Sequence, residues 1–181
     1  MPRLRWVRVL ALSLLLAGCR LAGDAQTTGV PGSRPICAVF FSPHGGCTEE
    51  VVKELAAAKS RVLVQAYSFT SLPIARALAE AHRRGVRVEV LLDKSQHSHP
   101  YAAAAILMRA GVPVKIDAVH AIAHNKVMVI DGATVLTGSF NFTESAEDRN
   151  AENLLVVRDA AVAARYAKNW DAHRAHSTPY E

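Results

Sequence analysis

Three residues whose side chains could do chemistry stand close together in one stretch of the chain: His124, Lys126 and Asp131. The intervening residues 127–130 form an apolar, partly β-branched run, which predicts a strand. Side chains two apart in a strand point to the same face, so His124 and Lys126 are expected to share one face. An imidazole that can attack or carry a proton, beside an ammonium that attracts anionic oxygens, suits reaction at a phosphodiester.

Asp131 is interpreted as structural rather than reactive. It has the opposite strand parity to Lys126, and Asp131-Gly132 is a dipeptide typical of hairpin turns. Residues 134–137 can then return as the partner strand. We therefore expect Asp131 to have a structural task.

Two further segments complete the expected site. Ser139 and Asn141 again have a spacing of two, and they add neutral hydrogen-bond donors for phosphate oxygens. Glu152 lies in another apolar run that predicts a strand, where it could accept a hydrogen bond from the far nitrogen of His124 and stabilise its cation. The candidate catalytic residues are His124, Lys126, Asn141 and Glu152, and the candidate substrate-binding residues are Lys126, Ser139 and Asn141.

The pattern His-x-Lys-x-x-x-x-Asp, followed by Gly-Ser-x-Asn, resembles the phospholipase D superfamily. The resemblance extends from about Phe41 to Trp170 and includes residues 65–70, 84–86 and 138–143. This range is similar to the small bacterial secreted endonucleases of the superfamily, the Nuc type, which carry one such motif per chain. At the motif positions the chain does not depart from the pattern.

The resemblance implies an endonuclease that acts on nucleic acid, DNA or RNA, through a phosphohistidine and without a metal or other cofactor. Such an exchange needs two proton-handling groups on opposite sides of phosphorus, and this chain supplies one well-placed imidazole. A twofold homodimer would bring two copies of His124, Lys126 and Asn141 to one axis. By the resemblance, one His124 attacks and the other protonates the leaving oxygen.

Two alternatives stay open. The first is a phospholipase D or cardiolipin-type lipid hydrolase, because superfamily members do both chemistries and a lipid anchor would place the enzyme at its substrate. The second is a non-catalytic envelope protein that binds nucleic acid or lipid in a retained phosphate pocket. The intact set of candidate catalytic residues argues against this second alternative.

Residues 1–19 are expected to be an export signal, with three arginines before an apolar core too short to span a bilayer. Residues 16–19 resemble a bacterial lipobox, whose Cys19 would be lipidated and attach the chain to a membrane; signal cleavage near residues 22–25 is the alternative. Either predicts a periplasmic, envelope-anchored or secreted protein. A simple transmembrane anchor is the third and least favoured option. Without those arginines 18 basic and 16 acidic residues remain, so net charge does not argue for nucleic acid.

Cys37 and Cys47 remain as a pair once Cys19 is lipidated or removed. An exported protein can keep a disulfide, and the turn-forming residues between the two cysteines allow a closed loop. We expect a structural bridge. A zinc site is less expected, because His44 is near but a fourth ligand at typical spacing is not evident.

The remaining histidines are expected to lie at the surface, and the aromatic residues at a strand end are expected to pack in the core. His97 and His99 form a His-x-His pair, but without an evident carboxylate cluster a polar loop is favoured over a metal site. His120 is taken as a surface or rim residue. For Tyr67 and Phe69, which follow a predicted strand, packing is favoured over stacking on a base.

Strand and helix patterns alternate through the first half of the chain, which implies parallel crossovers. The prediction is one α/β domain over residues 36–176, with a mixed, mainly parallel sheet and helices on both faces. A flexible leader is expected over residues 20–35 and a tail over residues 177–181. Expected helices begin after the capping residues Thr48, Ser71 and Asp159, and another covers residues 101–110.

Overall fold

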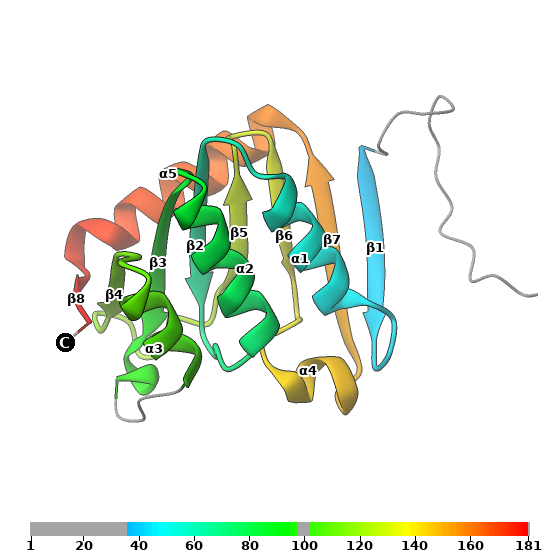
Figure 1. Ribbon diagram of the computed structural model, residues 1–181, viewed down its shortest axis with the longest axis horizontal. Coiled ribbons are helices and arrows are strands. Elements are labelled where there is room, and N and C mark those ends of the chain that lie inside the picture. The colour runs from blue at the N-terminus through cyan, green and yellow to red at the C-terminus, as the bar shows by residue number, and fades with distance from the viewer. Residues whose placement is uncertain (1–35, 98–101, 181) are drawn as a thin grey trace, which may run out of the picture.

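The structure, a computed structural model, describes residues 36–97 and 102–180, and the expected export signal, Cys19, the leader and His99 lie outside these ranges (Figure 1). Its strands are β1 (Cys37–Ser42), β2 (Arg61–Ala66), β3 (Arg87–Asp93), β4 (Val114–Asp117), β5 (Lys126–Ile130), β6 (Thr134–Gly138), β7 (Glu152–Arg158) and β8 (Thr178–Pro179). Its helices are α1 (Cys47–Ala57), α2 (Leu72–Arg83), α3 (Ala102–Arg109), α4 (Glu144–Asp148) and α5 (Ala160–His176), with a short 3-10 helix η1 (Lys94–Gln96).

The strands form one sheet in the order β1-β7-β6-β5-β2-β3-β4-β8. The expected mixed sheet is confirmed, but the expectation that it is mainly parallel is wrong. Only β2–β3 and β3–β4 are parallel pairs, whereas the other five neighbouring pairs are antiparallel. The reason is that β5, β6 and β7 follow one another as a meander and the first strand, β1, pairs with the last strand of that meander.

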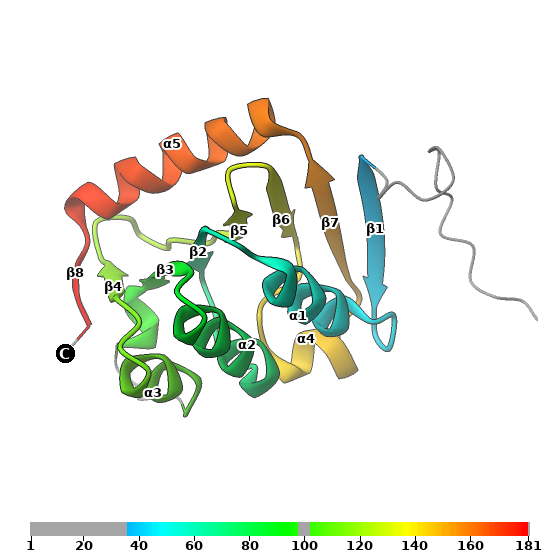
Figure 2. The same ribbon diagram turned by 45° about the horizontal axis from the view of Figure 1, so that its top comes forward.

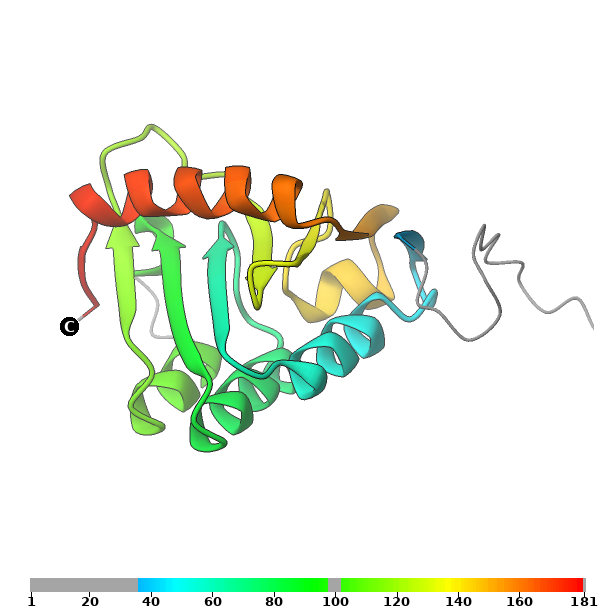
Figure 3. The same cartoon turned by 90° about the horizontal axis from the view of Figure 1, so that it is seen from above.

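Helices cover both faces of the sheet, as predicted. Helices α1, α2 and α3 lie on one face and α5 crosses the other (Figures 2 and 3). The strand period of two divides β5 between the faces: Met128 and Ile130 join the larger core, and Val127 and Val129 join the core beside α5. Trp170 of α5 is buried there, and its indole N–H donates to the Val64 carbonyl at 3.0 Å. With both faces buried, a one-residue slip of β5 would exchange its two apolar sets and is disfavoured.

Two of the three expected helix caps are confirmed. Ser71 accepts from the Ile74 N–H at the start of α2, and Asp159 accepts from the Val162 N–H at the start of α5. The third expectation is wrong, because α1 begins one residue earlier than Thr48, after Gly46 in a left-handed conformation (φ 77°). The three elements that sequence patterns did not predict, η1, α4 and β8, are too short to show a period.

The expected C-terminal tail belongs to the sheet. Strand β8 pairs antiparallel with β4, and the Tyr180 N–H donates to the Val114 carbonyl at 3.0 Å. The domain therefore extends to at least residue 180. Among the described helices, none is long and apolar enough to cross a membrane.

The expected disulfide between Cys37 and Cys47 is wrong, because both cysteines are free. Cys37 begins β1 and Cys47 begins α1 beyond the other end of that strand. A six-residue strand extends about 16 Å, whereas bridged cysteines need Cα atoms within about 7 Å. Burial raises the pKa of the Cys47 thiol to about 11, which keeps it protonated and unreactive at neutral pH.

Candidate active site

Four strand ends position the candidate residues at one edge of the sheet, the lower edge in Figure 1. Strands β2 and β6 end there, and β5 and β7 begin there, because these neighbours run antiparallel. Lys126 opens β5 opposite Ala66, the last residue of β2. Glu152 opens β7, and Gly138 closes β6 just before the Ser139–Asn141 segment.

His124 and Lys126 lie together, as the strand period predicted. The Lys126 Nζ is 3.0 Å from the His124 Nδ1, and it also donates to the His124 carbonyl at 2.9 Å. Lys126 is only 7% exposed, whereas His124 is exposed. Burial lowers the pKa of Lys126, although the Glu152 carboxylate opposes the shift. An ammonium can only donate, so a charged Lys126 makes Nδ1 the acceptor and leaves the ring proton on Nε2.

Tyr67 is a neighbour of this pair that sequence patterns did not assign to the site. Its ring centroid is 4.4 Å from that of His124, and the Lys126 Nζ lies 5.0 Å from the same tyrosine ring. The Tyr67 N–H donates to the Asn125 carbonyl at 2.8 Å, which extends the β2–β5 pairing by one step. The tyrosine therefore supports one side of His124 and contacts the ammonium by a cation–π interaction. Phe69 is buried in the core, as predicted.

The Ser139–Asn141 segment is held against Asn153. The Asn153 carbonyl accepts from the Ser139 and Phe140 N–H groups at 3.1 and 3.2 Å, and the Asn153 N–H donates to the Ser139 Oγ at 3.0 Å. The serine hydroxyl hydrogen stays available to a ligand. The Asn141 Oδ1 is buried and has no hydrogen-bond partner among the described residues. This oxygen can only accept, so a phosphate would be bound by the amide N–H groups of Asn141 instead.

Gly138 makes this close approach possible. Its φ is 146°, and a Cβ added there would lie 2.2 Å from the Asn153 carbonyl oxygen. A larger residue would push β6 away from β7 and move Ser139 and Asn141 with it.

Glu152 does not make the expected hydrogen bond to His124. Its Oε1 accepts from the Asn150 side-chain amide at 3.0 Å, and within residues 36–97 and 102–180 no hydrogen bond joins Glu152 to His124. The Lys126 Nζ lies instead at the His124 nitrogen that a carboxylate would bind. Glu152 is still close enough to Lys126 for its charge to raise the pKa of the lysine.

Asp131 lies at the opposite end of β5, where backbone groups occupy its carboxylate. It accepts from the N–H groups of Lys59, Ser60 and Arg61 at 2.9, 2.7 and 3.0 Å, and from the Ser60 hydroxyl at 2.9 Å. Burial would raise the pKa of this carboxyl, but the hydrogen bonds together lower it below its ordinary value. Asp131 thus ties the β5–β6 turn to the start of β2 and does not reach the Lys126 end of the strand.

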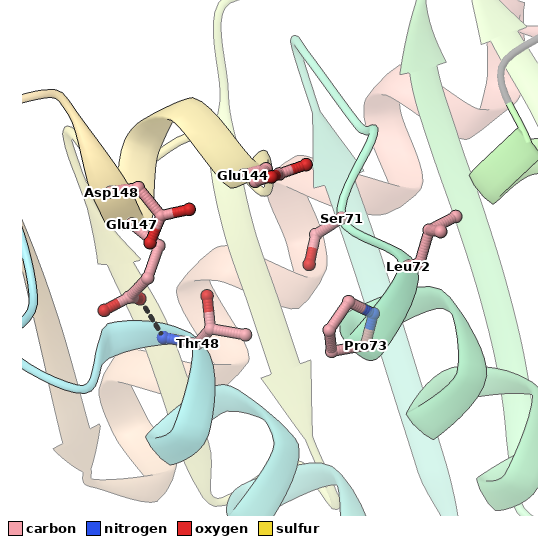
Figure 4. A pocket seen from close by; sticks show the side chains of 7 residues that line it. All are labelled: Thr48, Ser71, Leu72, Pro73, Glu144, Glu147 and Asp148. Atoms are coloured by element: carbon pink, nitrogen blue, oxygen red, sulfur yellow. Dashed lines mark hydrogen bonds between the residues drawn. The ribbon is translucent and has the colours of Figure 1, made fainter.

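A pocket of about 270 Å³ also lies near this edge of the sheet, but it has the wrong charge for a phosphate (Figure 4). Neither His124 nor Lys126 lines it. The Glu147 carboxylate in its wall accepts from the N–H groups of Gly46 and Thr48, at 3.3 and 2.6 Å, and so joins α4 to α1. Its lining residues are Thr48, Ser71, Leu72, Pro73, Glu144, Glu147 and Asp148. Three carboxylates repel an anion, so the phosphate site is assigned to the His124–Lys126 pair.

Known proteins resemble the chain over most of its length. The profile of the family described as "Cardiolipin synthase, PLD-like domain" matches residues 51–174, which include every candidate residue from His124 to Glu152. The chain is 41% identical to "Phospholipase D" of Rickettsia bellii over 145 residues, or 80% of this chain and 72% of that protein. It is 36% identical to "Mitochondrial cardiolipin hydrolase" of Xenopus laevis, with 86% and 85% of the two chains covered. Among solved structures, it is similar to Nuc from Salmonella typhimurium, described as a phospholipase D family member, at 33% identity and a TM-score of 0.75, covering 80% of this chain and 97% of that one.

Proposed function

Because the chain belongs to the phospholipase D superfamily and is a phosphodiesterase of that superfamily, we propose that its substrate is a phospholipid, whose head-group phosphodiester it hydrolyses. Cardiolipin-type lipids are the first class to test. The proposal places the lipid alternative of the sequence analysis ahead of the endonuclease. Two relatives named for lipid hydrolysis support this order, because each match covers more than two thirds of both chains.

The observation that carries the lipid proposal is the apolar character of the loop before His124. Val119 is 66% exposed and Ile122 is 55% exposed. The loop is anchored beneath them, since the Ala123 N–H donates to the buried Asp93 carboxylate at 2.7 Å. Exposed apolar side chains on an anchored loop can enter the interfacial region of a bilayer. In that position they would hold lipid head groups at the edge of the sheet where His124 lies.

In the proposed reaction, His124 is the nucleophile and its Nε2 must have a free lone pair. In the resting arrangement, Lys126 donates to Nδ1 and the ring proton is on Nε2. A substrate phosphate attracts the Lys126 ammonium to its oxygens and so frees Nδ1. Nδ1 can then carry the proton and donate to Glu152, which stabilises the cation that forms as Nε2 attacks. Ser139 and Asn141 are proposed to donate to the same phosphate oxygens.

The proposed chemistry has two displacements at phosphorus. Attack by Nε2 forms a phosphorus–nitrogen bond and breaks the bond to the leaving alcohol, which takes a proton from a second imidazole. Water then attacks phosphorus, gives a proton to that second imidazole and breaks the phosphorus–nitrogen bond. Among the described residues, one histidine, His124, lies beside Lys126, so the second imidazole must come from elsewhere. We propose that it is the His124 of a twofold-related partner chain.

A nuclease is the second candidate function. The observation that favours it is the likeness to Nuc, since the match covers 97% of that chain at 33% identity. Nucleic acid presents the same phosphodiester, and the proposed roles of His124 and Lys126 would not change. The difference lies in what surrounds the phosphate, which is an acyl-rich surface in one case and a charged polymer in the other.

The decisive experiment offers both substrates to the same enzyme. Wild-type protein is incubated with cardiolipin vesicles, phosphatidylcholine vesicles or supercoiled plasmid, and phosphatidic acid release and plasmid nicking are measured. We expect vesicle hydrolysis that is lost in His124→Ala and kept in His97→Ala, which removes an exposed histidine elsewhere. Plasmid nicking without lipid hydrolysis would assign the enzyme to nucleic acid. Substrate binding without turnover would support a non-catalytic protein.

A further inference from the structure

Three histidines converge on one buried carboxylate outside the site described above. Asp117 ends β4, His120 lies in the loop that follows, and His173 and His176 are in the last turn of α5. The Asp117 Oδ1 is 3.3 Å from the His120 Nδ1 and 3.2 Å from the His176 Nε2, and its Oδ2 is 2.6 Å from the His173 Nδ1. One nitrogen or oxygen from each residue lies within 4.8 Å of all the others. His124 is not a member, because β2 and β3 separate Asp117 from Lys126 in the sheet.

The charge of Asp117 needs a partner in the protein. Its side chain is 2% exposed, and within the described residues its ion pairs are with histidines alone. The three imidazole rings are close, with centroids 4.8, 5.4 and 5.5 Å apart, so three imidazolium ions would repel one another. A divalent cation would neutralise the carboxylate and let every imidazole be neutral.

The set fits zinc in number, type and spacing. Zinc takes four imidazole nitrogen and carboxylate oxygen ligands at about 2.0–2.2 Å in a tetrahedron, so neighbouring ligand atoms lie about 3.3 Å apart. The His120 and His176 nitrogens are already at about that separation from the Asp117 Oδ1. The four ligand atoms lie within 4.8 Å of one another, so the side chains would have to draw together around the ion. Since the protein supplies all four ligands, no position is left for water or substrate, which is typical of a structural site.

We propose that Asp117, His120, His173 and His176 form a structural zinc site that fixes the loop carrying His124. The site would join β4 and the C-terminal turn of α5 to the loop between β4 and β5. The same loop is already held from η1, where the Lys94 Nζ donates to the His120 carbonyl at 3.0 Å. A bound zinc would hold the apolar rim, formed by the exposed Val119 and Ile122, and the nucleophile His124 in place. It would take no part in the phosphodiester reaction.

Metal binding is tested on untagged full-length protein without substrate, so the outcome is independent of the proposed function. Chelator-treated protein is titrated with zinc chloride, and cobalt(II) absorption reports whether the site is tetrahedral. The variants are His120→Ala and His176→Ala, which truncate exposed ligands and should fold, with His97→Ala as the matched control. Magnesium, which prefers oxygen ligands, serves as the control cation.

We expect the wild type and His97→Ala to bind about one zinc ion per chain and to gain about 5 °C or more in thermal midpoint at saturation. Magnesium should give no shift. The two ligand variants should bind zinc at least about 10-fold more weakly and lose the gain. Zinc should also slow hydrogen exchange in residues 118–125 of the wild type. The proposal would be overturned if the wild type bound no zinc, or if both ligand variants bound zinc as tightly as the wild type.

Discussion

The Lys126 ammonium lies 3.0 Å from the Nδ1 of His124. In the free protein, the two residues expected to act on a phosphate are therefore hydrogen-bonded to each other. This contact leaves Nε2 protonated and the imidazole unable to attack through it. It also explains why Glu152 is bound to Asn150 rather than to the histidine. Substrate phosphate is the group that can separate the pair, since it competes for the ammonium. Activation of the nucleophile is then linked to substrate binding.

The first prediction concerns the cost of burying Lys126. Because burial lowers its pKa below the ordinary value, the folded protein holds the ammonium less favourably than the unfolded chain does. Lys126→Met should therefore raise the thermal midpoint at pH 7 by about 2 °C or more while lowering turnover about 100-fold or more. Circular dichroism melts and initial rates check both effects. Lys168→Met, an exposed lysine of α5, should change neither. A less stable Lys126→Met would mean that the contacts with His124 outweigh the burial.

The second prediction is a pH-dependent loss of stability in Asp131→Asn. Folding lowers the Asp131 pKa, so its contribution is fully present above the unfolded value of about 3.9 and is lost as pH falls through the folded value. The variant should lose about 2 kcal/mol at pH 7 and less as the pH is lowered through that window. Urea melts across pH measure the difference. Asparagine tolerates the positive φ of 54°, so backbone strain is not a competing cause. An equal loss at every pH would contradict the role of the charge.

The third prediction separates two glycines with positive φ. Gly138→Ala puts a Cβ against the Asn153 carbonyl and should destabilise the protein by about 2 kcal/mol or more. It should also lower turnover, since Ser139 and Asn141 follow directly. Gly132→Ala is the matched control, because its φ is 67° and nothing lies within 4 Å of an added Cβ. That variant should lose only about 1 kcal/mol and keep its turnover. Similar rates in the two variants would remove Gly138 from the positioning of the site.

Sequence patterns sufficed where the contact depends on neighbouring residues. The strand period predicted that His124 and Lys126 meet, and the Asp-Gly pair predicted the hairpin between β5 and β6. The caps of α2 and α5 follow from single residues at the helix starts. Each of these contacts is made between residues a few positions apart in the chain. They can therefore be predicted without knowing the order of strands in the sheet.

Contacts between distant segments could not be predicted in the same way. Asp117 meets His173 and His176 across 56 and 59 residues, and sequence patterns suggested no carboxylate partner for the histidines. Tyr67 joins His124 only because β2 pairs antiparallel with β5. The expected Cys37–Cys47 bridge was wrong for a related reason. The turn-forming residues between them were expected to close a loop, but the extended strand β1 carries the two cysteines apart.

The fourth prediction tests whether the apolar loop recognises a membrane. Val119→Ser combined with Ile122→Ser removes both exposed apolar side chains and leaves the chemistry at His124 unchanged. We expect binding to cardiolipin vesicles to weaken about 10-fold or more and hydrolysis of the vesicles to fall with it. Hydrolysis of bis(p-nitrophenyl) phosphate, a small soluble phosphodiester, should stay at the wild-type rate. Val39→Ser, which removes an exposed apolar side chain from the edge strand β1, is the control for general loss of surface hydrophobicity. If the loop variant binds and cleaves vesicles like the wild type, Val119 and Ile122 do not recognise the membrane, and the lipid proposal loses the observation that carries it.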